Sequence, residues 1–175
     1  MVILDPYLPD IMESVVGRVN TFFESQDNPF SVAYDKGLYN QVGNDRDDSD
    51  LFIWLVMPFE EDRRKPEIYA SVKPRLIIAS TTEANYTMQQ REDINFKPRL
   101  LPVYQKLLEE IQAEQMFGYP KYVNHSKKIL PYWGGGDVNG TGTPNLWKRF
   151  VDCIDVNNIN LEIQNNKNCT FFSNI

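Results

Sequence analysis

The side chains that most often perform covalent or metal chemistry are few in this sequence. The chain has one histidine, His125, and two cysteines, Cys153 and Cys169. A histidine acts as a general base when a nucleophile and an orienting partner are present, and no Ser–His–Asp or Cys–His pattern surrounds His125. Neither cysteine has a second Cys or His at the spacing of a zinc site, so we expect free thiols.

A cluster of carboxylates at 44–50 has a partial resemblance to a calcium-binding loop. Asp45, Asp47 and Ser49 stand where the first three ligands of such a loop would be. The sixth position holds Asp50 instead of glycine, and the twelfth holds Val56 instead of glutamate, so the pattern fails twice. We therefore predict a solvated loop and no metal site.

A glycine-rich run, Gly134–Gly142, also fails as a binding motif. It lacks the Lys-Ser/Thr pair of a phosphate loop and the G-x-G-x-x-G spacing of a dinucleotide fold. We expect a long flexible loop that, in an assembly, orders against a neighbour. A catalytic pair of carboxylates, as in glycoside hydrolases, remains an alternative. With 24 acidic residues in the chain, such a pair is possible, but the sequence does not identify which two residues would form it. The missing motifs predict a protein that is not an enzyme and uses no cofactor.

Composition indicates an ordinary globular chain. The 175 residues suit a single domain over 1–175, with extended loops and a polar C-terminal tail. The net charge of −6 argues against a nucleic-acid binder, and the 13% aromatic content favours a protein interface mildly. No apolar run reaches membrane-spanning length, and the first ten residues do not resemble a signal peptide. We expect assembly inside a cell and no membrane.

Hydrophobic periodicity predicts two amphipathic helices. One covers Tyr7–Glu24, where apolar residues recur at steps of three and four. The other begins near Pro102, a residue suited to a first helical turn, and carries an apolar stripe from Leu100 to Ile111. A helix with one apolar face must bury it, and the strand expected at Arg75–Ser80 is its nearest candidate partner.

Strands are expected around these helices. Leu51–Met57 is continuously apolar, which is typical of a central strand buried on both faces. The sequence predicts the following further segments: a strand at Phe30–Tyr34, a turn at Asp35–Gly37, a segment pairing back at Tyr39–Val42, a charged loop at Glu60–Pro66, extended chain at Ile68–Val72, a polar extended arm at Thr81–Lys97, a helical turn at Leu146–Cys153 and a bulged strand at Asp152–Ile163. The fold class is therefore α+β, a mostly antiparallel sheet flanked by two helices, with long loops.

This order of elements resembles the neck proteins of tailed bacteriophages. The resemblance is carried by Arg75–Ile78, by Phe96–Tyr104, and by Tyr132–Gly134 followed by Val151–Asp155. Among neck proteins, the chain is most similar to the tail terminator, or tail completion, proteins of Bacteroidetes phages and prophages. The glycine run and the C-terminal tail depart from that pattern.

The resemblance implies a structural virion protein, assembled in the bacterial cytoplasm, that forms a homo-oligomeric ring, commonly a hexamer. The ring would end the tail tube, join it to the head connector or head-closure protein, and let DNA pass without specific binding. Alternatives are another neck or minor virion component, or a small carbohydrate-active or carbohydrate-binding module with a carboxylate pair. We predict the following subunit contacts: Asn85, Tyr86, Met88, Gln90, Arg91, Trp133, Asp137 and Asn139.

Overall fold

The computed structural model describes residues 6–43, 51–64, 69–136, 142 and 144–164. Its strands form two sheets, one ordered β1-β2-β5-β7-β6 and a smaller one ordered β3-β4-β8. Every strand pair is antiparallel except β1–β2, so the predicted α+β class is confirmed. The elements are α1 (Leu8–Glu24), β1 (Ala33–Leu38), η1 (Tyr39–Gln41), β2 (Leu51–Met57), β3 (Glu61–Asp62), β4 (Ala70–Val72), β5 (Leu76–Thr81), α2 (Met88–Arg91), η2 (Glu92–Leu100), α3 (Leu101–Ala113), η3 (Gln115–Phe117), β6 (Ser126–Trp133), β7 (Val151–Asn157) and β8 (Leu161–Ile163).

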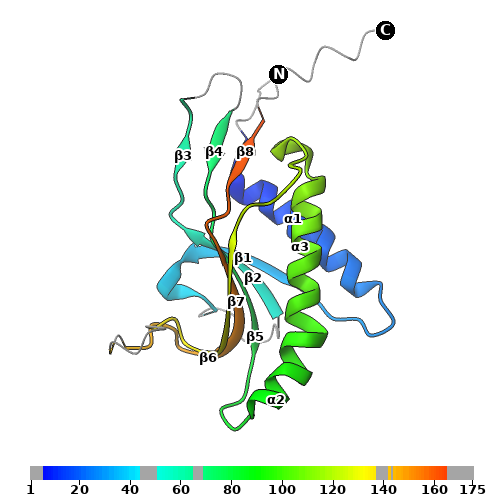
Figure 1. Ribbon diagram of the computed structural model, residues 1–175, viewed down its shortest axis with the longest axis vertical. Coiled ribbons are helices and arrows are strands. Elements are labelled where there is room, and N and C mark those ends of the chain that lie inside the picture. Colours follow the sequence, from blue (N-terminus) through cyan, green and yellow to red (C-terminus); the bar gives the residue numbers. More distant parts are fainter. Residues whose placement is uncertain (1–5, 44–50, 65–68, 137–141, 143, 165–175) are drawn as a thin grey trace.

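The two predicted helices cover one face of the large sheet. Figure 1 shows α1 and the long helix ending in α3 crossing over the same side of the strands. Each large side chain buried here contributes about 1.5–3 kcal/mol. The core beneath them includes Leu8, Met12, Val15, Val19, Ile53, Ile78, Leu107, Ile111 and Ile154. At the surface, Arg18 of α1 joins the helices through Glu110 of α3 and Glu114, the residue that follows α3, each at 2.7 Å.

The opposite face of the sheet has a smaller, aromatic core. Trp54, Trp133 and Trp147 all lie on this side. Each indole N–H donates to a backbone carbonyl: Trp54 to Gly37 at 3.2 Å, Trp133 to Gly136 at 3.1 Å and Trp147 to Tyr39 at 2.6 Å. Because all three polar ends are satisfied, the rings can be largely buried without an unpaired donor.

The predicted extended arm at Thr81–Lys97 is wrong, because most of it is helical. Thr87 caps a helix that begins at Met88: its hydroxyl accepts from the Gln90 amide at 3.2 Å, and the Gln90 side chain accepts from the Thr87 N–H at 2.8 Å. Helical backbone then continues through the π-helical stretch η2 into α3. Pro102 does lie in the first turn of α3, but helical backbone precedes it.

The predictions around β1 are also wrong in the positions of the strand and the turn. Strand β1 begins at Ala33, and the expected turn at Asp35–Gly37 lies inside it. Gly37 is there because a Cβ would lie 2.7 Å from the Trp54 ring, so only glycine lets that indole pack against β1. Tyr39–Val42 does not pair back, since Tyr39–Gln41 forms a 3₁₀ turn.

The expected bulged strand at Asp152–Ile163 is two strands in different sheets. Strand β7 pairs with β5 and β6, whereas β8 pairs with β4. Asn158, between them, has a positive φ of 53°, so the chain turns where the apolar alternation slips by one residue. The helical turn expected at Leu146–Cys153 is wrong, because β7 already begins at Val151. The expected charged loop at Glu60–Pro66 contains the short strand β3.

Candidate interaction surface and the clasp beneath it

Asp152 of β7 is the centre of a buried polar network. Its side chain has no exposed surface. The oxygen Oδ1 accepts from Arg91 Nη1 at 3.0 Å and from the Tyr132 backbone N–H at 2.9 Å. The oxygen Oδ2 accepts from Asn95 Nδ2 at 2.6 Å and from Thr82 Oγ1 at 2.8 Å. A buried carboxylate is tolerated only when it is paired and hydrogen-bonded in this way.

Arg91 joins this network from the helical segment 88–100. Its side chain is 5% exposed. Besides Asp152, its guanidinium donates to the Thr82 hydroxyl and, at 2.7 Å, to the Glu83 carbonyl. It also lies over two aromatic rings, 4.9 Å from the centroid of Tyr132 and 5.9 Å from that of Tyr86.

The network fixes the segment 82–95 to the edge strand β6. We call this network the Asp152 clasp. It comprises Asp152, Arg91, Asn95, Thr82 and the backbone of Tyr132. The regular pairing of β6 with β7 breaks between Leu130 and Trp133. Pro131 has no N–H to offer a neighbour, and Tyr132, with a positive φ of 45°, turns its own N–H onto Asp152. The clasp therefore depends on an irregularity in the edge strand.

The clasp joins two segments that both carry large exposed apolar side chains. Strand β6 is the last strand of its sheet, so one of its sides has no strand partner among the described residues. We use the name β6-edge surface for the exposed or half-buried apolar side chains of these two segments: Ile129 and Tyr132 of β6, and Tyr86, Met88 and Ile94 of the clasped segment. The ring of Tyr132 stacks on Phe150, with 4.5 Å between centroids. Exposed aromatic and aliphatic groups of this kind are typical of interaction sites.

The predicted contact residues divide into four groups. Asn85, Met88 and Gln90 are exposed on or beside the β6-edge surface, and Tyr86 is half-buried there. Arg91 is buried within the subunit, so any part it has in a contact is indirect. Trp133 is half-buried against Trp147, with 4.9 Å between ring centroids. Asp137 and Asn139 lie outside the described residues.

Sequence reasoning missed Asp152, Asn95, Ile129 and Tyr132. Ile129 carried a usable signal, since it stands beside Lys127 and Lys128, and lysines are common on unpaired edge strands. No local sequence signal marks the Asp152 carboxylate as a site residue, because its partners are as many as 70 residues away in the chain.

The first part of the glycine run is packed rather than loose. Gly135 has a φ of +77°, and a Cβ there would lie 2.5 Å from the Trp147 indole nitrogen. The carbonyl of Gly134 accepts from the backbone N–H groups of Leu146 and Trp147, at 2.9 and 2.7 Å. Residues 137–141, the middle of the expected loop, lie outside the described residues.

A second carboxylate on β7, Asp155, is also paired with an arginine. Arg75 donates to both of its oxygens, at 3.0 and 2.7 Å, and stacks 4.4 Å from the centroid of Tyr39. Burial raises the pKa of the Tyr39 phenol to about 12, although Arg75 acts in the opposite direction. Asp152 and Asp155 therefore bind arginines of their own chain, and within the described ranges no group of three or more His, Cys, Asp or Glu side chains is placed to hold a metal.

The single histidine has a fixed hydrogen-bonding role. His125 Nδ1 lies 2.6 Å from the Val123 carbonyl, and Nε2 lies 2.6 Å from the Tyr104 hydroxyl. Because a carbonyl only accepts, Nδ1 carries the proton, and in the neutral ring Nε2 accepts from Tyr104. His125 thus connects α3 to the start of β6.

Cys153 is expected to react with thiol reagents only when the protein unfolds. It is fully buried, and burial raises the pKa of its thiol well above the ordinary value, with the Asp155 and Asp152 carboxylates acting in the same direction. In a Cys169→Ser variant, a disulfide reagent should label Cys153 at the rate of global opening and label it fully in denaturant. Rapid labelling of the native variant would contradict this burial.

No helix in the part of the chain described by the structure is long and apolar enough to cross a membrane. Comparison of the chain with protein-family models, with curated proteins and with solved structures gave no match.

Proposed function

We propose that this chain is a structural virion protein whose copies form a ring at the head–tail junction of a tailed phage, where the ring ends the tail tube. The resemblance in element order motivates the proposal. The observation that carries it is the β6-edge surface: Ile129, 49% exposed, lies on a strand that has no partner on one side among the described residues, and Met88, 51% exposed, lies on the segment that the clasp joins to that strand. Such a surface is suited to burial by another protein chain.

The two edges of the large sheet suit a head-to-tail contact between copies. A ring needs two different surfaces on each subunit, so that one copy's first surface binds the next copy's second. The β6-edge surface lies at one side of the sheet. At the other side, β1 is the terminal strand and exposes Leu38 by 48%. In the proposed ring, these two edges would be the two surfaces in contact.

The proposal is tested by the oligomeric state of the full chain, measured by analytical ultracentrifugation and negative-stain microscopy with and without tail tubes. We expect closed rings, formed alone or on the tube ends. Protein that stays monomeric at high concentration and leaves tube ends bare would overturn the proposal. Labelling the protein in assembled particles separates a tail terminator from a head-closure subunit.

Replacing Ile129 with aspartate is expected to abolish ring formation without unfolding the subunit. The substitution places a charge on the exposed side of β6, where a neighbour would have to desolvate it. Sedimentation measures assembly, and circular dichroism checks the fold.

The matched control is Tyr122→Asp, which introduces the same charge at a tyrosine that is 67% exposed outside this surface. Rings that persist in Ile129→Asp, or that are lost equally in both variants, would exclude the β6 edge as the contact.

A further inference from the structure

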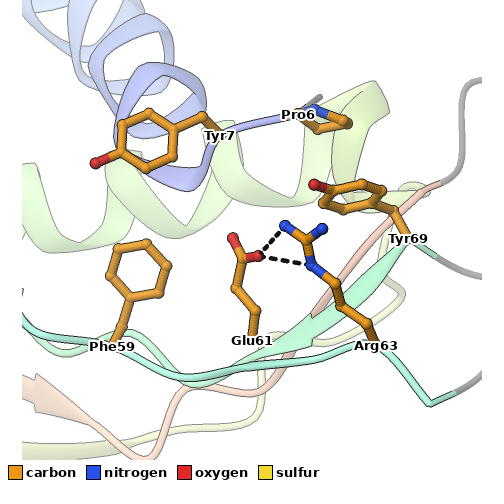
Figure 2. A pocket seen from close by; sticks show the side chains of 6 residues that line it. All are labelled: Pro6, Tyr7, Phe59, Glu61, Arg63 and Tyr69. Atoms are coloured by element: carbon orange, nitrogen blue, oxygen red, sulfur yellow. Dashed lines mark hydrogen bonds and ion pairs between the residues drawn. The ribbon is translucent and has the colours of Figure 1, made fainter. Parts of the chain in front are cut away.

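A hollow of about 410 Å³ opens to the surface between the small sheet and the start of α1. Pro6 and Tyr7 line it from the residues before α1, and Phe59, Glu61 and Arg63 from β3 and its flanks; Tyr69, just before β4, completes the wall. Figure 2 shows the Glu61 carboxylate standing between the Phe59 ring and the Arg63 guanidinium. The hollow thus combines three aromatic rings with one carboxylate.

One half of the hollow already holds a cation of the chain itself. Arg63 lies over the Tyr69 ring, 4.4 Å from its centroid. Its Nη2 and Nε both donate to the same oxygen of Glu61, Oε2, at 2.7 and 3.1 Å. The half formed by Tyr69 and Glu61 therefore binds a positive group by a ring face and a carboxylate oxygen.

The other half has the same kinds of group, and no cation of the described residues lies between them. The second oxygen of Glu61, Oε1, has no hydrogen-bond partner among the residues that the structure describes. Tyr7, 45% exposed, and the half-buried Phe59 line this part of the hollow. Tyr7 also attracts an ammonium of its own chain, because Lys36 Nζ lies 5.6 Å from its ring centroid without lining the hollow.

We propose that this hollow binds the ammonium group of a lysine side chain from a protein partner. Two aromatic rings and a carboxylate oxygen that has no partner among the described residues are complementary to an alkylammonium group, whose stem packs on the rings. A guanidinium fits less well, since its fork is best bound by two oxygens of one carboxylate, and Arg63 already uses Oε2 of Glu61. Lysine binding in this hollow does not depend on ring formation.

The test is a titration of the full chain, followed by NMR, with three blocked Gly-X-Gly peptides in which X is lysine, arginine or Nε-acetyl-lysine. We expect saturable shifts of the Tyr7 and Phe59 ring signals with the lysine peptide. Binding of the arginine and acetyl-lysine peptides should be weaker by roughly tenfold or more, the loss of one charge-assisted contact.

The variant Glu61→Gln should weaken lysine-peptide binding by a similar factor, about tenfold. Its matched control is Glu60→Gln, which removes the same charge from the preceding residue, whose side chain lines a different hollow. Amide spectra show whether each variant keeps the fold. Absence of saturable shifts, equal binding of the three peptides, or equal weakening by Glu60→Gln and Glu61→Gln would overturn the proposal.

Discussion

Replacing Asp152 with asparagine is expected to lower the free energy of unfolding by about 3–5 kcal/mol, the usual effect of removing one partner of a buried ion pair. The amide keeps the shape of the carboxylate but leaves the Arg91 guanidinium, 5% exposed, without its counter-charge. It also replaces one acceptor oxygen of the clasp with a donor. Urea unfolding followed by circular dichroism measures the loss.

The matched control is Asp93→Asn, which removes a carboxylate from the same helical segment. The Asp93 side chain is 55% exposed and pairs with Lys97 in solvent, so the unfolding midpoint should barely change. Adding Arg91→Met to Asp152→Asn should restore part of the lost stability, because the unpaired charge is then gone. Equal effects of Asp152→Asn and Asp93→Asn would show that the clasp contributes little to folding.

Replacing Gly135 with alanine is expected to have the second largest effect. Alanine at a φ of +77° is strained by about 1–2 kcal/mol. In addition, its Cβ would overlap the Trp147 indole, and displacing a buried ring typically costs about 1–3 kcal/mol. The indole would also lose its 2.6 Å hydrogen bond to the Tyr39 carbonyl. Urea unfolding measures the total, and near-ultraviolet circular dichroism reports the displaced ring.

Gly142→Ala separates these two contributions. Gly142 also has a positive φ, +91°, but nothing lies within 4 Å of a Cβ built there. It should therefore show the backbone strain alone, and the difference between the variants gives the cost of moving Trp147. If Gly142→Ala destabilised the protein as much as Gly135→Ala, contact with Trp147 would not be the reason for glycine at 135.

The parts of the fold that could be predicted from sequence are those decided by apolar pattern. The helix at Leu8–Glu24 and the strands at Leu51–Met57 and Leu76–Thr81 were recognisable because their side chains bury against the core whatever their neighbours are. Segment 81–97 was mispredicted because two of its three buried side chains, Arg91 and Asn95, are polar, and Phe96 is the only apolar one. Asn95 and Arg91 are buried only because Asp152 is there to bind them, and that pairing is invisible to local periodicity.

The same limit applies to the candidate surface. Asn85, Tyr86, Met88 and Gln90 do lie on or beside it, since that stretch is polar and exposed in either a strand or a helix. Its other half, on β6, could not be located, because only the sheet order makes β6 an edge. The role of these residues in contacts between copies stays a prediction.

The placement of all three tryptophans on the sheet face opposite the helices has a practical consequence. Indole emission reports on that face alone, whereas the far-ultraviolet signal comes mainly from α1 and the helix through α3 on the other face. The two layers thus carry separate built-in probes. A perturbation that separates the helices from the sheet would change the far-ultraviolet signal before the indole emission, and one that disrupts the tryptophan face would do the reverse. Partial unfolding of this protein can therefore be followed without any label.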